Sequence, residues 1–149
     1  SAYGAPAEML DRWPVGSHGT TFGGNPVACA AAVAVMDTMG PLLPNAREVG
    51  ARAMERFQKL AIDHPTIGDV RGLGLMIGVE LVADPETREP DAVAFKHLQR
   101  YCMDRELVII ECGPTGNIIR FIPPTITTLS EVDWAIDLID EALTDYEQT

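Results

Sequence analysis

The chain is poor in cysteine, which bounds both its redox setting and its chemistry. Its 149 residues include three cysteines, Cys29, Cys102 and Cys112. An odd number of cysteines without a CxxC pair argues against a disulfide framework and against a structural zinc site. We therefore expect free thiols in a reducing cytoplasm.

Histidine is equally scarce, and its distribution argues against a metal centre. The three histidines, His18, His64 and His97, are far apart in the sequence and have no carboxylate or cysteine at metal-ligand spacing. We expect each of them at a loop or surface position. The sequence predicts no metal site and shows no Ser-His-Asp or Cys-His arrangement.

Basic residues are few compared with acidic ones. The chain has 11 Lys and Arg against 22 Asp and Glu, which gives a formal net charge of -11. The basic residues are scattered and form no stripe, so phosphate backbones and anionic lipid surfaces are repelled. We expect no nucleic-acid partner and no membrane partner.

Long hydrophobic runs are also lacking. The longest apolar stretch, Pro26 to Met36, is rich in alanine and is too short by itself to cross a bilayer. The first residues lack the basic and apolar regions of a signal peptide. This composition favours a cytoplasmic protein.

What is present predicts an α+β fold with one core. Hydrophobic residues make up 46% of the chain and charged residues 22%, which suits one globular domain without repeats or low-complexity tracts. Apolar residues recur at helical spacing in four segments and at strand spacing in several others. The expected helices are 26–39, a second ending near 64–65, 92–105 and 130–146, and the expected strands are two within 67–82, then 107–110 and 118–122.

The N-terminal region combines loops with a well-marked helix start. Residues 1–24 read as loops around a short helix near 7–12. Asn25 caps free amides, and Pro26 suits the first helical turn because it has no N–H to satisfy. Gly40, Pro41 and Pro44 predict a break before the second, amphipathic helix.

The segment from Gly19 to Pro26 contains a candidate anion site. Thr20 and Thr21 precede two glycines and a helix start, and hydroxyls with free amides in such a loop suit a phosphate. Pro26 removes one amide and Asn25 occupies another, so the hydroxyls matter more than the helix dipole. The alternative is an ordinary capped loop, and spacing alone favours it.

Arg120 is the second candidate, because it stands inside an apolar strand pattern. An unpaired buried guanidinium is costly, so Arg120 must meet an anion or reach water. A substrate carboxylate and a structural Asp or Glu suit its fork geometry equally well. By contrast, the glycines from Gly72 to Gly78 have GxGxxxG spacing within a strand pattern, which excludes a dinucleotide loop and indicates a hairpin or close backbone packing.

Three ordered segments carry a resemblance to a known family. They are Ser17–Ala32, with its Gly-Thr-Thr-Phe-Gly-Gly-Asn-Pro core, Val70–Gly78 and Gly116–Pro124. In this order they resemble the class III aminotransferases, which depend on pyridoxal phosphate (PLP). The resemblance implies the C-terminal small domain of the fold-type I PLP-dependent transferases for residues 40–149. Residues 1–39 would be the tail of the large domain, with a phosphate-contact loop and an interdomain helix.

The same resemblance assigns roles to the two candidate sites. In this family the threonine before the aromatic residue contacts the PLP phosphate of the neighbouring subunit in a homodimer, and this position is Thr21. Thr20 is the weaker candidate for cofactor binding. The arginine before the Pro-Pro segment binds the α-carboxylate of glutamate or 2-oxoglutarate, and this position is Arg120.

The reaction implied by the resemblance passes an amino group from an amino acid to a 2-oxo acid. Residues 111–117 resemble the branch that acts on 4-aminobutyrate, while ornithine, acetylornithine and other ω-amino donors stay open. Catalysis needs a Schiff-base lysine, and the chain has only Lys59 and Lys96, neither of which matches the family's lysine. We therefore expect a fragment that carries no catalytic residue and is inactive alone. The competing hypothesis is a non-catalytic module that binds a carboxylate or a protein.

Overall fold

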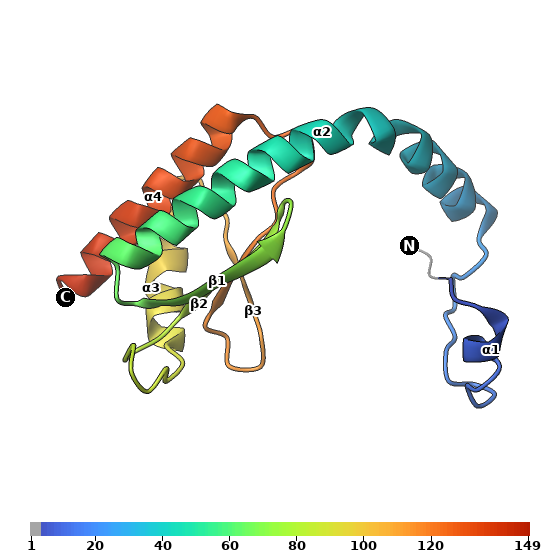
Figure 1. Cartoon of the computed structure of the whole chain (residues 1–149), viewed down its shortest axis with the longest axis horizontal. Coiled ribbons are helices and arrows are strands. Elements are labelled where there is room, and N and C mark those ends of the chain that lie inside the picture. Colours follow the sequence, from blue (N-terminus) through green and yellow to red (C-terminus); the bar gives the residue numbers. More distant parts are fainter. Residues whose placement is uncertain (1–3) are drawn as a thin grey trace. The chain divides into compact units, whose positions relative to one another are not determined.

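The computed structural model describes residues 4–149 and divides the chain into two compact units, Ser1–Pro41 and Leu42–Thr149. Figure 1 shows the helices and strands of the chain, coloured along the sequence. The first contains α1 (Ala7–Leu10) and the beginning of α2 (Pro26–Asp63). The second contains the remainder of α2 and all other elements.

The start of α2 agrees with the prediction from the sequence. The side-chain Oδ1 of Asn25 accepts hydrogen bonds from the amides of Val27 at 3.0 Å and Ala28 at 3.2 Å. These bonds satisfy two of the amides that a helix leaves without internal partners. Pro26 occupies the first helical position, where its missing N–H costs nothing.

The predicted helix break at Gly40, Pro41 and Pro44 is wrong, because α2 continues through these residues to Asp63. An interior proline removes a backbone hydrogen bond and costs about 3 kcal/mol. Burial of apolar side chains further along α2 offsets such a cost, and these residues are Val49, Ala53, Phe57 and Leu60. The prolines instead mark the boundary of the two units, which falls at Pro41.

The length of α2 also corrects the expectation about its apolar stretch. Within residues 4–149, α2 is the one helix long and apolar enough to cross a membrane, and its most apolar window has a mean hydropathy of 1.5 with 0% buried. This finding rests only on the length and composition of the helix. The core helix of a soluble protein and a signal sequence pass the same test of length and composition, so this helix is weak evidence for a membrane span.

The second unit is built on an antiparallel sheet of four strands in the order β1-β2-β4-β3. The strands are β1 (Ile67–Leu73), β2 (Met76–Leu81), β3 (Ile110–Cys112) and β4 (Ile118–Phe121). A tight turn joins β1 to β2, and Gly74 adopts a positive φ of 57° there. The hairpin predicted from the glycine spacing is therefore confirmed.

Strand β3 begins later than the sequence indicated. The pattern predicted a strand at 107–110, but the amide of Leu107 donates to the carbonyl of Cys102 at 2.9 Å, and Glu106 has a φ of 69°. These features complete the turn that ends α3 (Ala92–Met103). Pairing with β4 starts only at Ile110.

Helices and sheet share one core, which confirms the α+β class. α4 (Leu129–Glu147) begins at a capping box in which Thr128 and Glu131 exchange hydrogen bonds. Alternate sheet residues, among them Ile77, Val79 and Ile119, are buried with apolar residues of α2, α3 and α4. Phe57 of α2 meets the edge of Phe121 at 5.1 Å between ring centroids. Helices thus cover one face of the sheet.

Candidate functional site

The uncovered face of the sheet carries a row of residues across all four strands. The register aligns Arg71 of β1 with Gly78 of β2, Gly78 with Arg120 of β4, and Arg120 with Ile110 of β3. Directly paired residues in antiparallel strands project to the same side of a sheet. The row therefore contains two arginines with a glycine between them.

The two arginines of this row differ in their ionic partners. Arg71 donates to Asp69 at 2.6 Å and to Glu80 at 2.7 Å, so neighbouring carboxylates balance its charge. Arg120 is exposed, although Ile119 and Phe121 beside it are buried. No carboxylate within residues 4–149 forms an ion pair with Arg120. The structural Asp or Glu that the sequence offered as its alternative partner is therefore not found within these residues.

Arg120 also borders an apolar groove of about 600 Å³ between the sheet edge and α4. The apolar residues lining it include Val108, Ile110, Ile122, Pro124, Ile126 and Trp134. One carboxylate, that of Glu131, reaches the groove. The amide and hydroxyl of Thr128 donate to this carboxylate, each at 2.8 Å, and these bonds lower the pKa of Glu131. Glu131 is thus engaged in the helix cap.

The second candidate site lies in the first unit, just before α2. Residues 21–24 form a turn in which the amide of Asn25 donates to the carbonyl of Phe22 at 3.2 Å, and Gly24 has a φ of 76°. Thr20 packs its methyl group against Gly23, where an added Cβ would approach it to 2.5 Å. Thr21 is the first residue of this turn.

The hydroxyl groups of this loop can donate hydrogen bonds to a phosphate. The side chains of Thr20 and Thr21 are exposed and have no hydrogen-bond partner in the part of the chain that the structure describes. Asn25 already accepts the Val27 and Ala28 amides. Hydroxyl donation to phosphate oxygens is therefore the available contact, as the missing amide of Pro26 indicated.

Neither lysine stands in a setting that suits a catalytic amine. Lys59 is exposed on α2, and Lys96 on α3 forms an exposed ion pair with Glu111. Activation of a nucleophilic lysine needs desolvation or a neighbouring cation, whereas both of these amines are exposed to solvent. Both residues occupy the solvated helix positions expected from the sequence.

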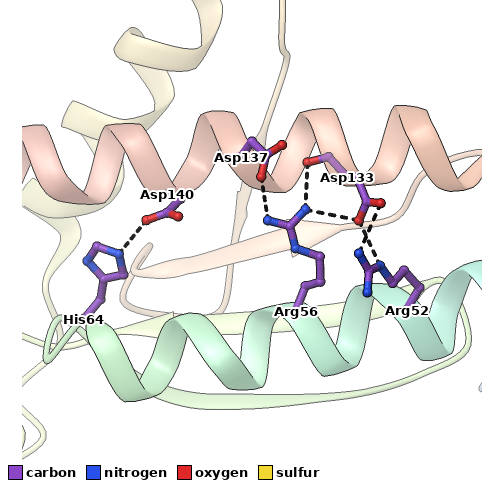
Figure 2. Close-up of polar contacts among 6 residues, drawn as sticks. All are labelled: Arg52, Arg56, His64, Asp133, Asp137 and Asp140. Atoms are coloured by element: carbon purple, nitrogen blue, oxygen red, sulfur yellow. Dashed lines mark hydrogen bonds and ion pairs between the residues drawn. The ribbon is translucent and has the colours of Figure 1, made fainter.

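A row of ion pairs between α2 and α4 was not predicted from the sequence. Figure 2 shows cationic groups at and just beyond α2 opposite carboxylates of α4: Arg52, Arg56, His64, Asp133, Asp137 and Asp140. The Arg52 hydrogen bond, aided by Arg56, holds the pKa of Asp133 below its usual value. These pairs join α4 to the part of α2 that belongs to the second unit.

His64 lies in the loop that follows α2, one of the two positions expected for it, but it is buried, with only 6% of its surface exposed. Its Nδ1 lies 2.9 Å from Glu147 and its Nε2 lies 2.8 Å from Asp140. The partners follow it by 83 and 76 residues, so local spacing held no signal for them. Within residues 4–149 no group of three or more His, Cys, Asp or Glu side chains could hold a metal ion.

Comparison with known proteins defines the class of this fold. The model of the family described as aminotransferase class-III matches residues 1–143. The PLP-bound crystal structure of an amine transaminase from an uncultivated Pseudomonas species superposes with a TM-score of 0.73 at 34% identity, covering 88% of this chain and 30% of that one. The chain belongs to the class III aminotransferase family, whose cofactor is pyridoxal phosphate.

Curated relatives extend over nearly the whole chain. The 4-aminobutyrate aminotransferase of Escherichia coli (strain K12) is 33% identical over 95% of this chain and 34% of its own length. The ornithine aminotransferase of Brevibacillus brevis is 38% identical over 96% and 33%. The isoleucine 2-epimerase of Lentilactobacillus buchneri is 38% identical over 94% and 31%. The chain spans about a third of the length of these relatives.

Proposed function

We propose that this chain is the C-terminal third of a PLP-dependent aminotransferase that moves an amino group from an ω-amino acid, 4-aminobutyrate, to 2-oxoglutarate. Family membership and the 4-aminobutyrate aminotransferases among the relatives support the proposal. The observation that carries it is Arg120, an exposed guanidinium without an ionic partner within residues 4–149, set on an uncovered sheet face.

In this proposal Arg120 holds the α-carboxylate of the acceptor. A guanidinium presents parallel N–H donors that match both oxygens of a carboxylate, and such charge-assisted pairs also fix orientation. The strand fixes the Arg120 backbone between β2 and β3, so the donors start from a rigid base. No acidic side chain of the described chain competes with the substrate for this guanidinium.

Thr21, with Thr20 as the weaker candidate, donates its hydroxyl to the cofactor phosphate of the neighbouring subunit in a homodimer. When bound, pyridoxal phosphate supplies the electron sink that lets an amino group leave one carbon skeleton and enter another. The chain itself supplies the acceptor clamp and the phosphate contact. We propose that it is inactive alone because neither Lys59 nor Lys96 is placed to act as the catalytic amine, and that the full-length enzyme works in the cytoplasm.

The Arg120 assignment is tested in the full-length enzyme by Arg120→Ala. We expect the KM for 2-oxoglutarate to rise by at least tenfold and the acceptor half-reaction to slow, since a charge-assisted hydrogen bond contributes about 1.5–3 kcal/mol. Arg71→Ala is the matched control, because Arg71 lies in the same row but has its own carboxylates. An unchanged acceptor half-reaction in the Arg120 variant would refute the clamp.

The phosphate contact is tested by Thr21→Ala, with Thr21→Ser as the variant that keeps the hydroxyl. Loss of one hydroxyl donor to a charged phosphate should weaken cofactor retention, by tenfold or more in Kd, and serine should restore it. Thr20→Ala tests the weaker candidate in the same assay, and a smaller loss is expected there. Equal cofactor occupancy after dialysis in Thr21→Ala and wild type would return the segment to an ordinary capped loop.

The amino donor is the less defined half of the proposal. The relative named ornithine aminotransferase favours ornithine-type and acetylornithine-type donors as the second candidate. A panel of donors in the half-reaction distinguishes them, with 4-aminobutyrate expected to give the highest kcat/KM. Absence of amino transfer from every donor in the full-length protein would instead favour epimerase chemistry or a non-catalytic binding module.

A further inference from the structure

Gly78 stands in the middle of β2 without a conformational reason for being glycine. Its φ lies outside the left-handed region, unlike that of Gly72 or Gly74 in the same hairpin. Glycine weakens the interior of a strand because it loses more backbone entropy and has no side chain to pack. A residue that favours strands would therefore stabilise this position.

Packing within the second unit does not require glycine at this position either. A Cβ built on Gly78 would lie 3.4 Å from Cγ2 of Ile118 and 3.9 Å from the carbonyl oxygen of Arg71, which are ordinary contacts. At Gly72, by comparison, it would come within 2.3 Å of the carbonyl oxygen of Met76. A strand glycine that neither turn nor packing explains often marks a place where a ligand or another backbone approaches closely.

The neighbours of Gly78 indicate what approaches it. It pairs directly with Arg120, and paired Cα atoms in antiparallel strands are about 4.5–5.5 Å apart. On the other side of Arg120 stands Ile110, which is 50% exposed. Gly78 thus leaves bare backbone on the strand beside Arg120, and the Arg71 beyond it is already paired with carboxylates.

We propose that Gly78 determines acceptor specificity, because it leaves room beside Arg120 for the portion of a 2-oxo acid that adjoins its carboxylate. The inference rests on the proposed function and deepens it. The carboxylate is seated on Arg120, and the adjoining carbon atoms lie over the backbone of β2. A side chain at position 78 occupies that space and displaces the acceptor from the guanidinium.

The test compares Gly78→Ala and Gly78→Val with wild type in the full-length enzyme, with the two half-reactions measured separately. We expect the KM for 2-oxoglutarate to rise a few-fold with alanine and at least tenfold with valine, while the half-reaction with 4-aminobutyrate keeps its rate. Met76→Val is the matched control, since Met76 is 67% exposed on the same strand and face but lies outside the arginine row.

A measurement of thermal stability distinguishes a role of Gly78 in acceptor specificity from a purely structural role. Valine favours strands and a Cβ at this position meets only ordinary contacts, so the thermal midpoint of Gly78→Val should equal or exceed that of wild type. An active wild type with unchanged acceptor KM in Gly78→Val overturns the inference alone. Equal losses in both half-reactions, or a lower midpoint, overturn it as well. A wild type without amino transfer overturns the proposed function itself.

Discussion

The buried His64 should make the stability of the chain fall as the pH rises through neutrality. Both of its ring nitrogens face carboxylate oxygens, Glu147 at 2.9 Å and Asp140 at 2.8 Å. A neutral imidazole has one N–H and satisfies only one of them, whereas the imidazolium donates to both. Burial lowers the pKa of His64, but the hydrogen bonds and negative charges of Glu147 and Asp140 raise it by more, to above its ordinary 6.5.

The sign of the effect follows from this raised pKa. A group whose folded pKa exceeds its unfolded value contributes its full stabilisation below pH 6.5 and loses it as the pH passes the folded pKa. A charge-assisted hydrogen bond contributes about 1.5–3 kcal/mol. Since the Asp140 side chain is 41% exposed, solvent screens part of this interaction, and the lower end, about 1.5 kcal/mol, is the expected loss.

Urea unfolding of wild type and His64→Gln at pH 6 and pH 9 measures this loss. Glutamine donates hydrogen bonds but does not titrate, and the pair between His97 and Asp145 is common to both proteins. The difference in the free energy of unfolding between the two proteins should be about 1.5 kcal/mol larger at pH 6. Parallel pH profiles would refute the reasoning.

Two further predictions concern the same unit. Gly50→Ala should destabilise the protein by about 1–3 kcal/mol, although this change usually stabilises a helix, because the new Cβ would lie 2.4 Å from the backbone of Gly74. A higher thermal midpoint would contradict it. Thr128→Ala should cost about 1 kcal/mol in chemical unfolding through loss of the α4 cap, with Thr128→Ser close to wild type; equal losses in both variants would exclude the capping explanation.

Short-range sequence patterns correctly predicted the helices, the hairpin and the helix cap that are determined mainly by interactions between neighbouring residues. The cap at Asn25, the β1–β2 hairpin and helices α3 and α4 follow from side-chain chemistry and spacing within a few residues. The break at Pro41 failed because the proline penalty is local, whereas the burial of Phe57 and its neighbours that offsets it is a tertiary effect. Propensity is a weak guide wherever packing competes with it.

The functional residues likewise fall into those that the sequence could indicate and those that only the folded structure brings together. Thr21 and Arg120 were recognisable from sequence, since each stands in a distinctive motif, and their roles stay proposals. The place of Gly78 beside Arg120 depends on the register between β2 and β4, which no local pattern encodes. The ion pairs of His64 depend likewise on helices that meet only in the folded chain.

The prolines inside α2 have a mechanical consequence. Pro41 and Pro44 have no amide hydrogen, so the carbonyls of Asp37 and Gly40 lack the donor that each would meet one turn later. The two missing hydrogen bonds are three residues apart, within about one turn, and their loss lowers the bending stiffness of the helix at this place. Since the boundary between the compact units also falls at Pro41, the helix is most compliant where one unit ends and the other begins.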